Sequence, residues 1–472
     1  MRLSHLVRDA SSSRTLGFTF ISSLTSRKQS PRTSTSTLST SVAAPLPQPR
    51  FGDRRPLTAS FAATTAALLV GVSAAQAGGF AVREQSAYGQ GSSFAGMAAP
   101  GGSISSMFWN PAAITTVTGM TAEGNLTGVF PQSELDVDPS RSTLTRLGIT
   151  GNGGNVGETG VVPAAYFAMP VTDQLYFGVS FNAPYGFSTT SEPPWVGMFS
   201  HLDAEAKSVN VTPVVGYKFN DMVSVAVGLQ VEYFEVSIET AMAPTASPPR
   251  QRLEGDSTDV GFVAGLTLTP LDGTTIGIGY RSSVKHSLDG SQTFGVPLRT
   301  PLGTIPAGAY PVTADVSLPD TLSIGVRQRI TDAFTMMAGM EWANWSRIQT
   351  VPFVGSPTRS NLALQFDDGW FFSLGGEYKY DPNWTFRTGL GYEIAPTTDE
   401  HRSMRLPDAD RVWASIGASY NWTEQLSIDA GYSHIFVEDA PVDETTAGFR
   451  YAGTAEGSAD IFSIGVRYKF GG

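Results

Sequence analysis

The chain has 472 residues, of which 41% are hydrophobic and 15% charged, and it contains no cysteine. These figures exclude a disulfide-stapled scaffold, a thiolate metal site and a collagen. The 31 basic and 42 acidic side chains give a formal net charge of −11. No run of about 20 apolar residues follows residue 77, so no mature helix can span a bilayer.

The basic residues concentrate in the first 77 positions, which hold nine Lys or Arg and two acids. The remainder therefore has 31 − 9 = 22 basic and 42 − 2 = 40 acidic side chains, a net charge of −18. An acidic mature chain without a basic cluster has no footprint for phosphates, so we expect no nucleic-acid partner. Residues 1–50 form a basic, Ser/Thr-rich leader; a start codon assigned too far upstream is our preferred explanation, and a transit peptide the alternative.

Residues 51–77 have the three parts of a secretory signal in the required order. Arg54 and Arg55 precede an apolar run at 61–72, and the small-x-small triplet ends at Ala77. We expect cleavage after Ala77. The alternative, a short membrane anchor, has too few apolar residues to span a bilayer.

An alternation of apolar and polar residues dominates the chain from about residue 120. In segment 222–234, for example, the valines at 223, 225, 227 and 231 alternate with small or polar side chains. This period of two indicates extended strands with one apolar face. Fourteen such segments, each about ten residues long, lie between 119 and 470.

The connections between these segments alternate in length. Six are tight turns, at 172–173, 220–221, 270–273, 331–332, 381–382 and 423–424. Seven are predicted to be long loops, at 131–160, 185–206, 235–257, 286–318, 347–367, 394–408 and 435–460. This alternation predicts an all-β fold over 119–472, a closed antiparallel transmembrane β-barrel of about 14 strands with both ends on the short-turn side.

A soluble β-sandwich would also alternate apolar and polar residues. Aromatic residues at the strand ends favour the barrel, because they match the girdles found at a lipid interface. Examples are Tyr217, Phe219, Trp384 and Trp422.

Residues 78–118 do not follow the strand pattern. No charged residue occurs from Gln85 to Ala122, and the segment is rich in Gly, Ser and Ala. It is too interrupted for a membrane helix and too apolar for a solvated tail. We expect an N-terminal hatch that plugs the barrel lumen, with a disordered periplasmic tail as the alternative.

Several short motifs resemble those of one known family. Near the predicted mature start stand Gly78-Gly79-Phe80, Gln85-Ser86-Ala87, Gly89-Gln90-Gly91 and Trp109-Asn110-Pro111-Ala112. Within the barrel stand Gly279-Tyr280-Arg281-Ser282, Leu318-Pro319-Asp320-Thr321, Glu341-Trp342 and Leu406-Pro407-Asp408. Together they resemble the outer-membrane long-chain fatty acid transporters of the FadL/TodX family, over essentially all of 78–472.

This resemblance implies a monomeric transporter in the bacterial outer membrane, in contact with its lipid. Hydrophobic substrate would be captured at the extracellular loops and enter the barrel. It would leave when the hatch shifts or through a lateral opening at a kinked strand. Long-chain fatty acids are the expected substrate. Aromatic or aliphatic hydrocarbons are the first alternative, and a general diffusion porin is the second.

A carboxylate substrate would need a cation inside the barrel, and an arginine suits it best. Strand parity places Arg281, Arg327 and Arg387 on the lumen side. Trp342 and Trp345 are further candidates, although one of the two must face lipid if the strand stays regular.

Two other segments carry candidate residues. The apolar loop at 185–206 could capture substrate or merely cover the barrel mouth; its candidate residues are Tyr185, Phe187, Trp195, Val196, Met198 and Phe199. In the hatch the candidates are Phe80, Asn110 and Pro111, with the Asn-Pro turn expected to fix the chain rather than touch substrate.

Four histidines follow residue 77, at 201, 286, 401 and 434, and none neighbours a recognisable serine motif. We therefore expect no enzyme activity, no cofactor and no metal site.

Overall fold

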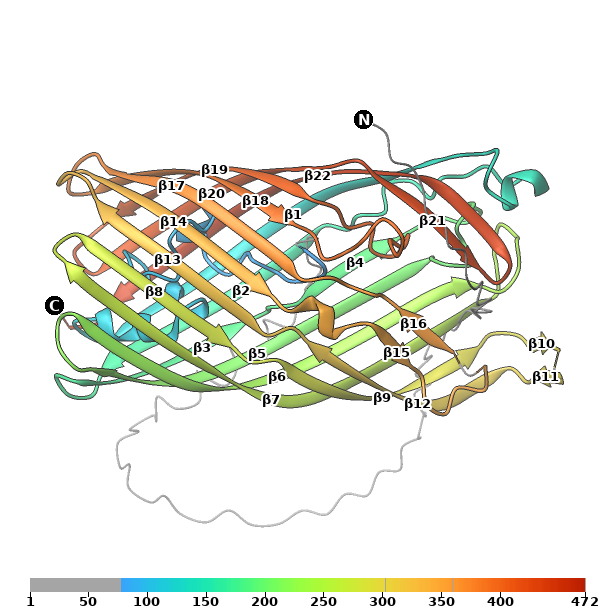
Figure 1. The fold of residues 1–472 in the computed structure, drawn as a ribbon, viewed down its shortest axis with the longest axis horizontal. Helices are drawn as coiled ribbons and strands as arrows, with labels where there is room; N and C mark the ends of the chain where they lie inside the picture. The colour runs from blue at the N-terminus through green and yellow to red at the C-terminus, as the bar shows by residue number, and fades with distance from the viewer. Residues whose placement is uncertain (1–77, 302, 359, 472) are drawn as a thin grey trace, which may run out of the picture. The chain divides into compact units, whose positions relative to one another are not determined.

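The computed structural model describes residues 78–301, 303–358 and 360–471. The predicted leader, signal peptide and cleavage site lie before the first described residue. Within the described residues, fourteen antiparallel strands close into a barrel (Figure 1). Closure follows from the pairing of the first strand, β1 (Thr121–Val137), with the last, β22 (Phe449–Lys469).

Four of the fourteen strands are interrupted and carry two labels each. The strands between β1 and β22 are β2 (Gly160–Pro170), β3 (Leu175–Asn182) with β4 (Gly186–Thr190), β5 (Asp203–Lys218), β6 (Val223–Ala241), β7 (Arg250–Leu271), β8 (Thr274–Arg281) with β9 (Val284–Phe294), β12 (Gly308–Leu318) with β13 (Thr321–Arg329), β14 (Phe334–Ala343), β17 (Gly369–Lys379), β18 (Trp384–Ile394), β19 (Arg411–Asn421) and β20 (Leu426–Val437) with β21 (Ala440–Thr446). Short strands outside the ring are β10 (Leu298–Thr300), β11 (Gly303–Ile305), β15 (Thr350–Pro352) and β16 (Asn361–Ala363).

The six tight turns lie where the sequence predicts them, each between two neighbouring barrel strands. The prediction of seven long loops is wrong in part, because several strands continue well into those ranges. β6 continues to Ala241 and β7 already begins at Arg250. β20, β21 and β22 occupy most of 435–460. These extensions carry charges such as Glu239, Arg250 and Arg252, which pair with one another. They lack the apolar outer face from which the membrane strands were recognised.

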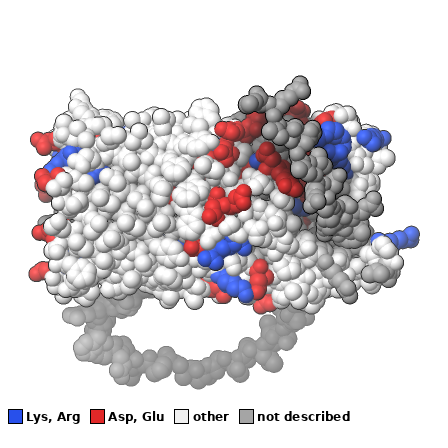
Figure 2. Space-filling model, viewed as in Figure 1, with Lys and Arg blue, Asp and Glu red and all other residues white. Residues whose placement is uncertain are grey.

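The outer surface of the barrel is apolar over a broad zone between the charged side chains at the short-turn end and those near the long loops (Figure 2). On β6, Val227 and Leu229 are 64% and 51% exposed, whereas Ala226 and Gln230 are buried. This pattern is that of a wall with lipid outside and packed side chains inside. No helix among the described residues is long and apolar enough to cross a membrane.

Residues 78–118, the hatch, fill part of the lumen (Figure 1). The hatch contains α2 (Ala87–Gln90) and two 3-10 helices, η1 (Ile104–Phe108) and η2 (Pro111–Thr116); 3-10 turns η3 (Leu144–Leu147) and η4 (Trp345–Arg347) lie in loops. Most hatch side chains are buried. The hatch lies so close to the wall that a Cβ on Gly417 of β19 would meet the Cα of Gly91 at 2.6 Å. Small residues on both sides therefore allow this packing.

Candidate functional site

The start of the hatch fills an interruption in the barrel wall. Strand β3 ends at Asn182 and β4 begins at Gly186, so the ladder of β3 and β4 with β5 is interrupted between these residues. The hatch supplies partners: Val82 N donates to Pro184 O at 2.8 Å, and Gly186 N donates to Phe80 O at 2.8 Å. The first residues of the hatch thus act as a short strand beside the gap.

Phe80 anchors this part of the hatch in a cluster of rings. Its ring centroid lies 4.7 Å from that of Trp345 and 6.1 to 6.2 Å from those of Tyr185, Phe187 and Phe234. The side chain is buried. Such ring pairs stabilise beyond their buried area, so Phe80 is a strong attachment point.

An apolar cavity of about 90 Å³ lies on the extracellular side of this cluster. Phe80 and Phe187 form part of its lining, with side chains of β6, β7, β9 and β12 and of the loop at 344–368. Its lining is almost wholly hydrocarbon, with one charged residue, Arg405. A site of this composition suits an apolar ligand.

A second, more polar cavity of about 290 Å³ adjoins the apolar cavity and shares lining residues with it, including Ser403, Arg405, Ile238 and Phe353. We call it the vestibule. Its other walls carry Glu400, His401, Arg402, Asp443 and Glu444. The two cavities together are polar at one end and apolar at the other.

Arg405 stands where the two cavities meet. Its Nη2 donates to Ser200 Oγ at 3.1 Å and lies 3.6 Å from Glu444 Oε1. Its Nε is buried and has no hydrogen-bond partner among the described residues. Because Ser200, Thr446 and the Met404 amide already donate to Glu444, Arg405 keeps donor capacity for another group.

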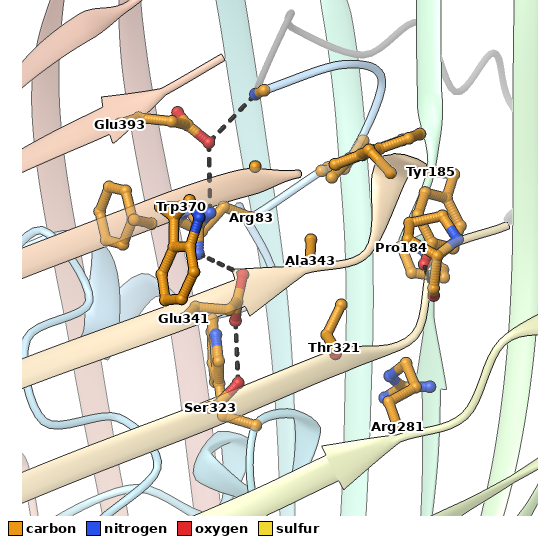
Figure 3. Close-up of a pocket in the computed structure, with 18 of the residues that line it drawn as sticks. Arg83, Pro184, Tyr185, Arg281, Thr321, Ser323, Glu341, Ala343, Trp370 and Glu393 are labelled. Carbon is orange, nitrogen blue, oxygen red and sulfur yellow. Dashed lines mark hydrogen bonds and ion pairs between the residues drawn. The ribbon is translucent and has the colours of Figure 1, made fainter. Parts of the chain in front are cut away.

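A third, inner cavity of about 50 Å³, drawn in Figure 3, borders Tyr185 and Trp345 of the Phe80 cluster. Its lining includes the first residues of the hatch, Pro184 and Tyr185 at the wall interruption, and ends of β13, β14, β17 and β18. Arg83 of the hatch donates to Glu341 at 2.7 Å and to Glu393 at 3.2 Å. These two acids neutralise Arg83, so it is a poor candidate for binding an anion.

Arg281 is the other cation of the inner cavity (Figure 3). It donates to the Gln230 amide oxygen at 2.6 Å and to Phe108 O at 3.2 Å, and its guanidinium lies over the Phe108 ring. No ion pair among the described residues includes Arg281. Of the three arginines that the sequence singles out, it alone lines this cavity with a guanidinium held by neutral groups.

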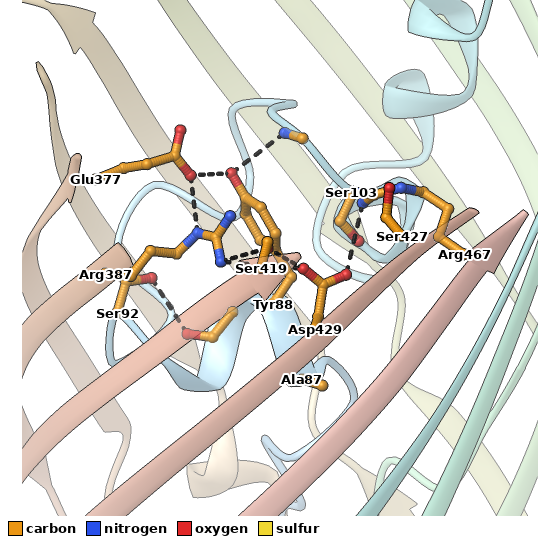
Figure 4. A network of polar contacts seen from close by, with 12 residues as sticks. Ala87, Tyr88, Ser92, Ser103, Glu377, Arg387, Ser419, Ser427, Asp429 and Arg467 are labelled. Atoms are coloured by element: carbon orange, nitrogen blue, oxygen red, sulfur yellow. Dashed lines mark hydrogen bonds and ion pairs between the residues drawn. The ribbon is translucent and has the colours of Figure 1, made fainter. Parts of the chain in front are cut away.

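Arg327 and Arg387 instead hold the hatch in place. Figure 4 shows Arg387 with Glu377 and Tyr88. Both pair with Glu377, at 2.9 and 2.8 Å, and Tyr88 of the hatch donates its hydroxyl to the same carboxylate. Arg387 also lies 3.6 Å from the Tyr88 ring centroid. We infer that these two arginines serve hatch attachment, and their predicted role in ligand binding stays untested.

The Asn110-Pro111 turn makes a second attachment. The Asn110 amide nitrogen donates to Ala98 O at 2.8 Å, and to Leu266 O and Thr267 Oγ1 on β7 at 3.0 and 3.1 Å. Its oxygen caps η2 by accepting from the Ala112 amide. These contacts tie the hatch to the wall, in line with the predicted role of the turn.

The two predicted tryptophans lie in different surroundings. Trp345 is buried against Phe80, whereas Trp342 is partly exposed and donates to Asp368. The strand ends at Ala343, so the alternation does not extend to Trp345.

The loop at 185–206 likewise splits into two groups. Tyr185 and Phe187 join the Phe80 cluster, while Trp195, Val196, Met198 and Phe199 pack in a separate buried cluster with Met404 and Tyr451. The second group lines neither the apolar cavity nor the vestibule. Its role in capture therefore stays a prediction, and the structure shows it as packing between loops.

Sequence reasoning missed Arg405 and Arg83. Arg405 lies in a loop without periodicity, and its cavity neighbours come from distant strands, so no local pattern marks it. Arg83 carried a usable signal: with Glu84 it precedes a charge-free run of 38 residues, from Gln85 to Ala122. An isolated pair of charges in an apolar plug is expected to meet buried counter-charges.

Comparison with known proteins gives consistent matches over the barrel and the hatch. The model of the family "Outer membrane protein transport protein (OMPP1/FadL/TodX)" matches residues 68–470. The long-chain fatty acid transport protein of Escherichia coli O6:H1 is 27% identical over 425 residues, covering 83% of this chain and 94% of that protein. The 47 kDa outer membrane protein of Pasteurella multocida is 26% identical, covering 86% of this chain and 97% of its own length.

Two solved structures share the fold. The crystal structure of a Pseudomonas aeruginosa FadL homologue matches with a TM-score of 0.75 and 24% identity, covering 84% of this chain and 100% of that chain. The toluene transporter TodX of P. putida matches with a TM-score of 0.60 and 14% identity, covering 82% and 98%. At these identities the similarity concerns the fold alone.

Proposed function

We propose that this chain, which belongs to the OMPP1/FadL/TodX family of outer membrane transport proteins, carries long-chain fatty acids across the outer membrane by passive diffusion. Membership of this family establishes that the chain is an outer-membrane β-barrel transporter of hydrophobic compounds. The choice of a fatty acid rests on the site.

One observation carries the proposal: an apolar cavity ends at Arg405, beside a polar vestibule. A fatty acid has the same division, with a long apolar chain and one carboxylate. The Arg405 guanidinium would bind the carboxylate, and the cavity would hold the first part of the chain. At about 90 Å³ the cavity is too small for a whole acyl chain, so further entry requires Phe80 and the start of the hatch to move.

Movement of Phe80 would connect the apolar cavity with the inner cavity, because its ring cluster separates them. The inner cavity offers Arg281 as a second contact for the carboxylate. It also borders Pro184 and Tyr185 at the interruption between β3 and β4. The same displacement of the hatch would free the backbone groups at this gap and open a way out through the wall.

A neutral hydrocarbon is the second candidate, and the small size and apolar lining of the outer cavity favour it. At about 90 Å³ the outer cavity is smaller than the cavity of about 150 Å³ that holds benzene in another protein, so a small hydrocarbon needs much less widening than an acyl chain. For such a ligand Arg405 and Arg281 would have no direct role.

Binding to the purified protein separates the two candidates. We would measure the Kd of oleate, of oleyl alcohol and of toluene, for the wild type and for Arg405→Gln. Because Arg405→Gln removes a charge-assisted contact, it should raise the Kd of oleate roughly tenfold or more and leave the Kd of oleyl alcohol unchanged. The matched control is Arg299→Gln, an exposed arginine on β10 outside the three cavities. Equal binding of oleate and oleyl alcohol, insensitive to Arg405→Gln, would contradict the fatty acid and favour the hydrocarbon.

A further inference from the structure

The start of the hatch lies in a cluster of buried charges. Four acids, Glu84, Glu341, Glu393 and Asp408, surround two arginines, Arg83 and Arg411. Arg83 pairs with Glu341 and Glu393, and Arg411 pairs with Asp408 and lies 3.9 Å from Glu393. Arg402 touches the cluster through the Asp408 carbonyl oxygen, but its charge is matched by Asp399 at 2.7 Å.

The charges of this cluster do not balance. Four carboxylates and two guanidinium groups leave two negative charges in excess, and uncompensated charges are costly to bury. Both oxygens of Glu84 are buried without a hydrogen-bond partner among the described residues. Burial raises the pKa of Glu84 to about 7, so a proton on this group can remove one of the two charges.

The backbone at the start of the hatch points at two of the other three acids, Glu393 and Asp408. Gly78 N donates to Glu393 Oε1 at 3.0 Å (Figure 3), and Gly79 N donates to Asp408 Oδ2 at 2.8 Å. Glu393 and Asp408 are 3% and 0% exposed. Space is restricted here: a Cβ on Gly79 would meet the Trp345 ring at 2.9 Å, and the φ of +65° favours glycine.

We propose that the buried carboxylate of Glu393 binds a primary ammonium, the free α-amino group that signal cleavage after Ala77 creates on Gly78, while Asp408 holds the adjoining amide of Gly79. In the processed chain the nitrogen that already faces Glu393 gains a full positive charge. That charge balances the second excess acid, so that two arginines, one ammonium and one proton match four carboxylates. The contact then becomes an ion pair that holds the hatch end closed, and this charge is present only after processing.

This proposal depends on the predicted cleavage site and not on the identity of the substrate. The first test is mass spectrometry of the protein purified from outer membranes, which should show Gly78 as the first residue. A different first residue would overturn the proposal.

The second test measures the α-amine itself. Its ordinary pKa is about 7.7 to 8.0, well below that of lysine, so an activated ester near neutral pH labels it selectively. In the folded barrel we expect labelling to be at least roughly tenfold slower than in the unfolded chain, with its pH dependence shifted upward. A merely buried, uncharged amine would give a downward shift, which would overturn the proposal, as would equal labelling rates.

The third test asks whether the positive charge of the α-amine, and not only the space it fills, holds the hatch end closed. The α-amine of unfolded protein is either dimethylated, which keeps the charge, or acetylated, which removes it, before refolding. The chain has no cysteine, so Val82→Cys gives a single maleimide target in the hatch end. Acetylated protein should react roughly tenfold faster than dimethylated protein. Equal rates would overturn the role of the charge.

A genetic variant gives the same comparison in cells. One alanine inserted after Ala77 moves the ammonium away from Glu393 and leaves every carboxylate in place. The control is one alanine inserted after residue 60, which processing removes, so its mature chain is unchanged. Faster maleimide labelling of the first insertion alone is expected, and equal labelling of both would contradict the proposal.

Discussion

Replacement of Phe80 by alanine tests whether the hatch end is the gate between the outer and inner cavities. The ring contacts Trp345, Tyr185, Phe187 and Phe234, and it separates cavities of about 90 and 50 Å³. We expect its removal to join them into one larger space. The aromatic contacts hold the closed hatch and are lost when the hatch moves, so the variant should open more often.

The magnitude follows from the burial of the ring. Truncation of a buried phenylalanine to alanine costs roughly 3 to 5 kcal/mol, of which the ring pairs contribute about 0.5 to 1.5 kcal/mol each. If the open state exposes the ring, most of this difference acts on the equilibrium between closed and open hatch. The open fraction should then rise by roughly two orders of magnitude. Phe80→Leu keeps most of the apolar volume and should give a much smaller rise.

Single-channel conductance in planar bilayers reports the open fraction directly. We expect frequent openings for Phe80→Ala, rare openings for the wild type and an intermediate record for Phe80→Leu. Circular dichroism and heat modifiability on gels would confirm that the barrel is folded. A folded Phe80→Ala barrel that stays as closed as the wild type would refute the gating role of this ring.

Other changes test the remaining contacts. Gly417→Ala places a Cβ against the backbone of Gly91 and should loosen the hatch by about 1 to 3 kcal/mol, measured by hydrogen exchange of the hatch. Gly124→Ala, where a Cβ meets nothing within 4 Å, is its control and should change nothing. Tyr88→Phe removes the hydroxyl that donates to Glu377 and should raise solute leakage through the barrel in liposome swelling assays; unchanged leakage would show that this contact is dispensable. Burial lowers the pKa of the loop residue His201 to about 3, so the opened loop binds the proton more readily than the closed one. The closed loop is therefore fully stable above pH 6.5 and loses about 2 kcal/mol by pH 5, and the protection factors of 195–202 against hydrogen exchange should fall there in the wild type but not in His201→Phe.

The strands could be predicted because the bilayer imposes a simple pattern. Lipid outside and packed residues inside force an alternation, which is visible in Val227 and Leu229 against Ala226 and Gln230. Beyond the bilayer this constraint ends. The outer part of β7 begins Arg-Gln-Arg-Leu-Glu, and its exposed side faces water, so nothing in its sequence distinguished strand from loop.

The candidate site was harder to predict, because closure of the barrel creates it. Parity correctly put Arg281, Arg327 and Arg387 on the inner face, where all three are buried. Parity could not show that Arg327 and Arg387 both pair with Glu377, which also accepts from Tyr88 of the hatch. Nor could it find Arg405, whose place depends on loop packing.

Uptake of radiolabelled oleate by transporter-deficient cells tests the central claim most directly. The comparison is between the wild type, Arg405→Gln, Arg299→Gln and an empty vector, at matched amounts of folded protein in the outer membrane. We expect oleate uptake with the wild type and Arg299→Gln, and a marked loss with Arg405→Gln at low oleate concentration. Oleate uptake at the vector level with the folded wild-type barrel would contradict the central claim.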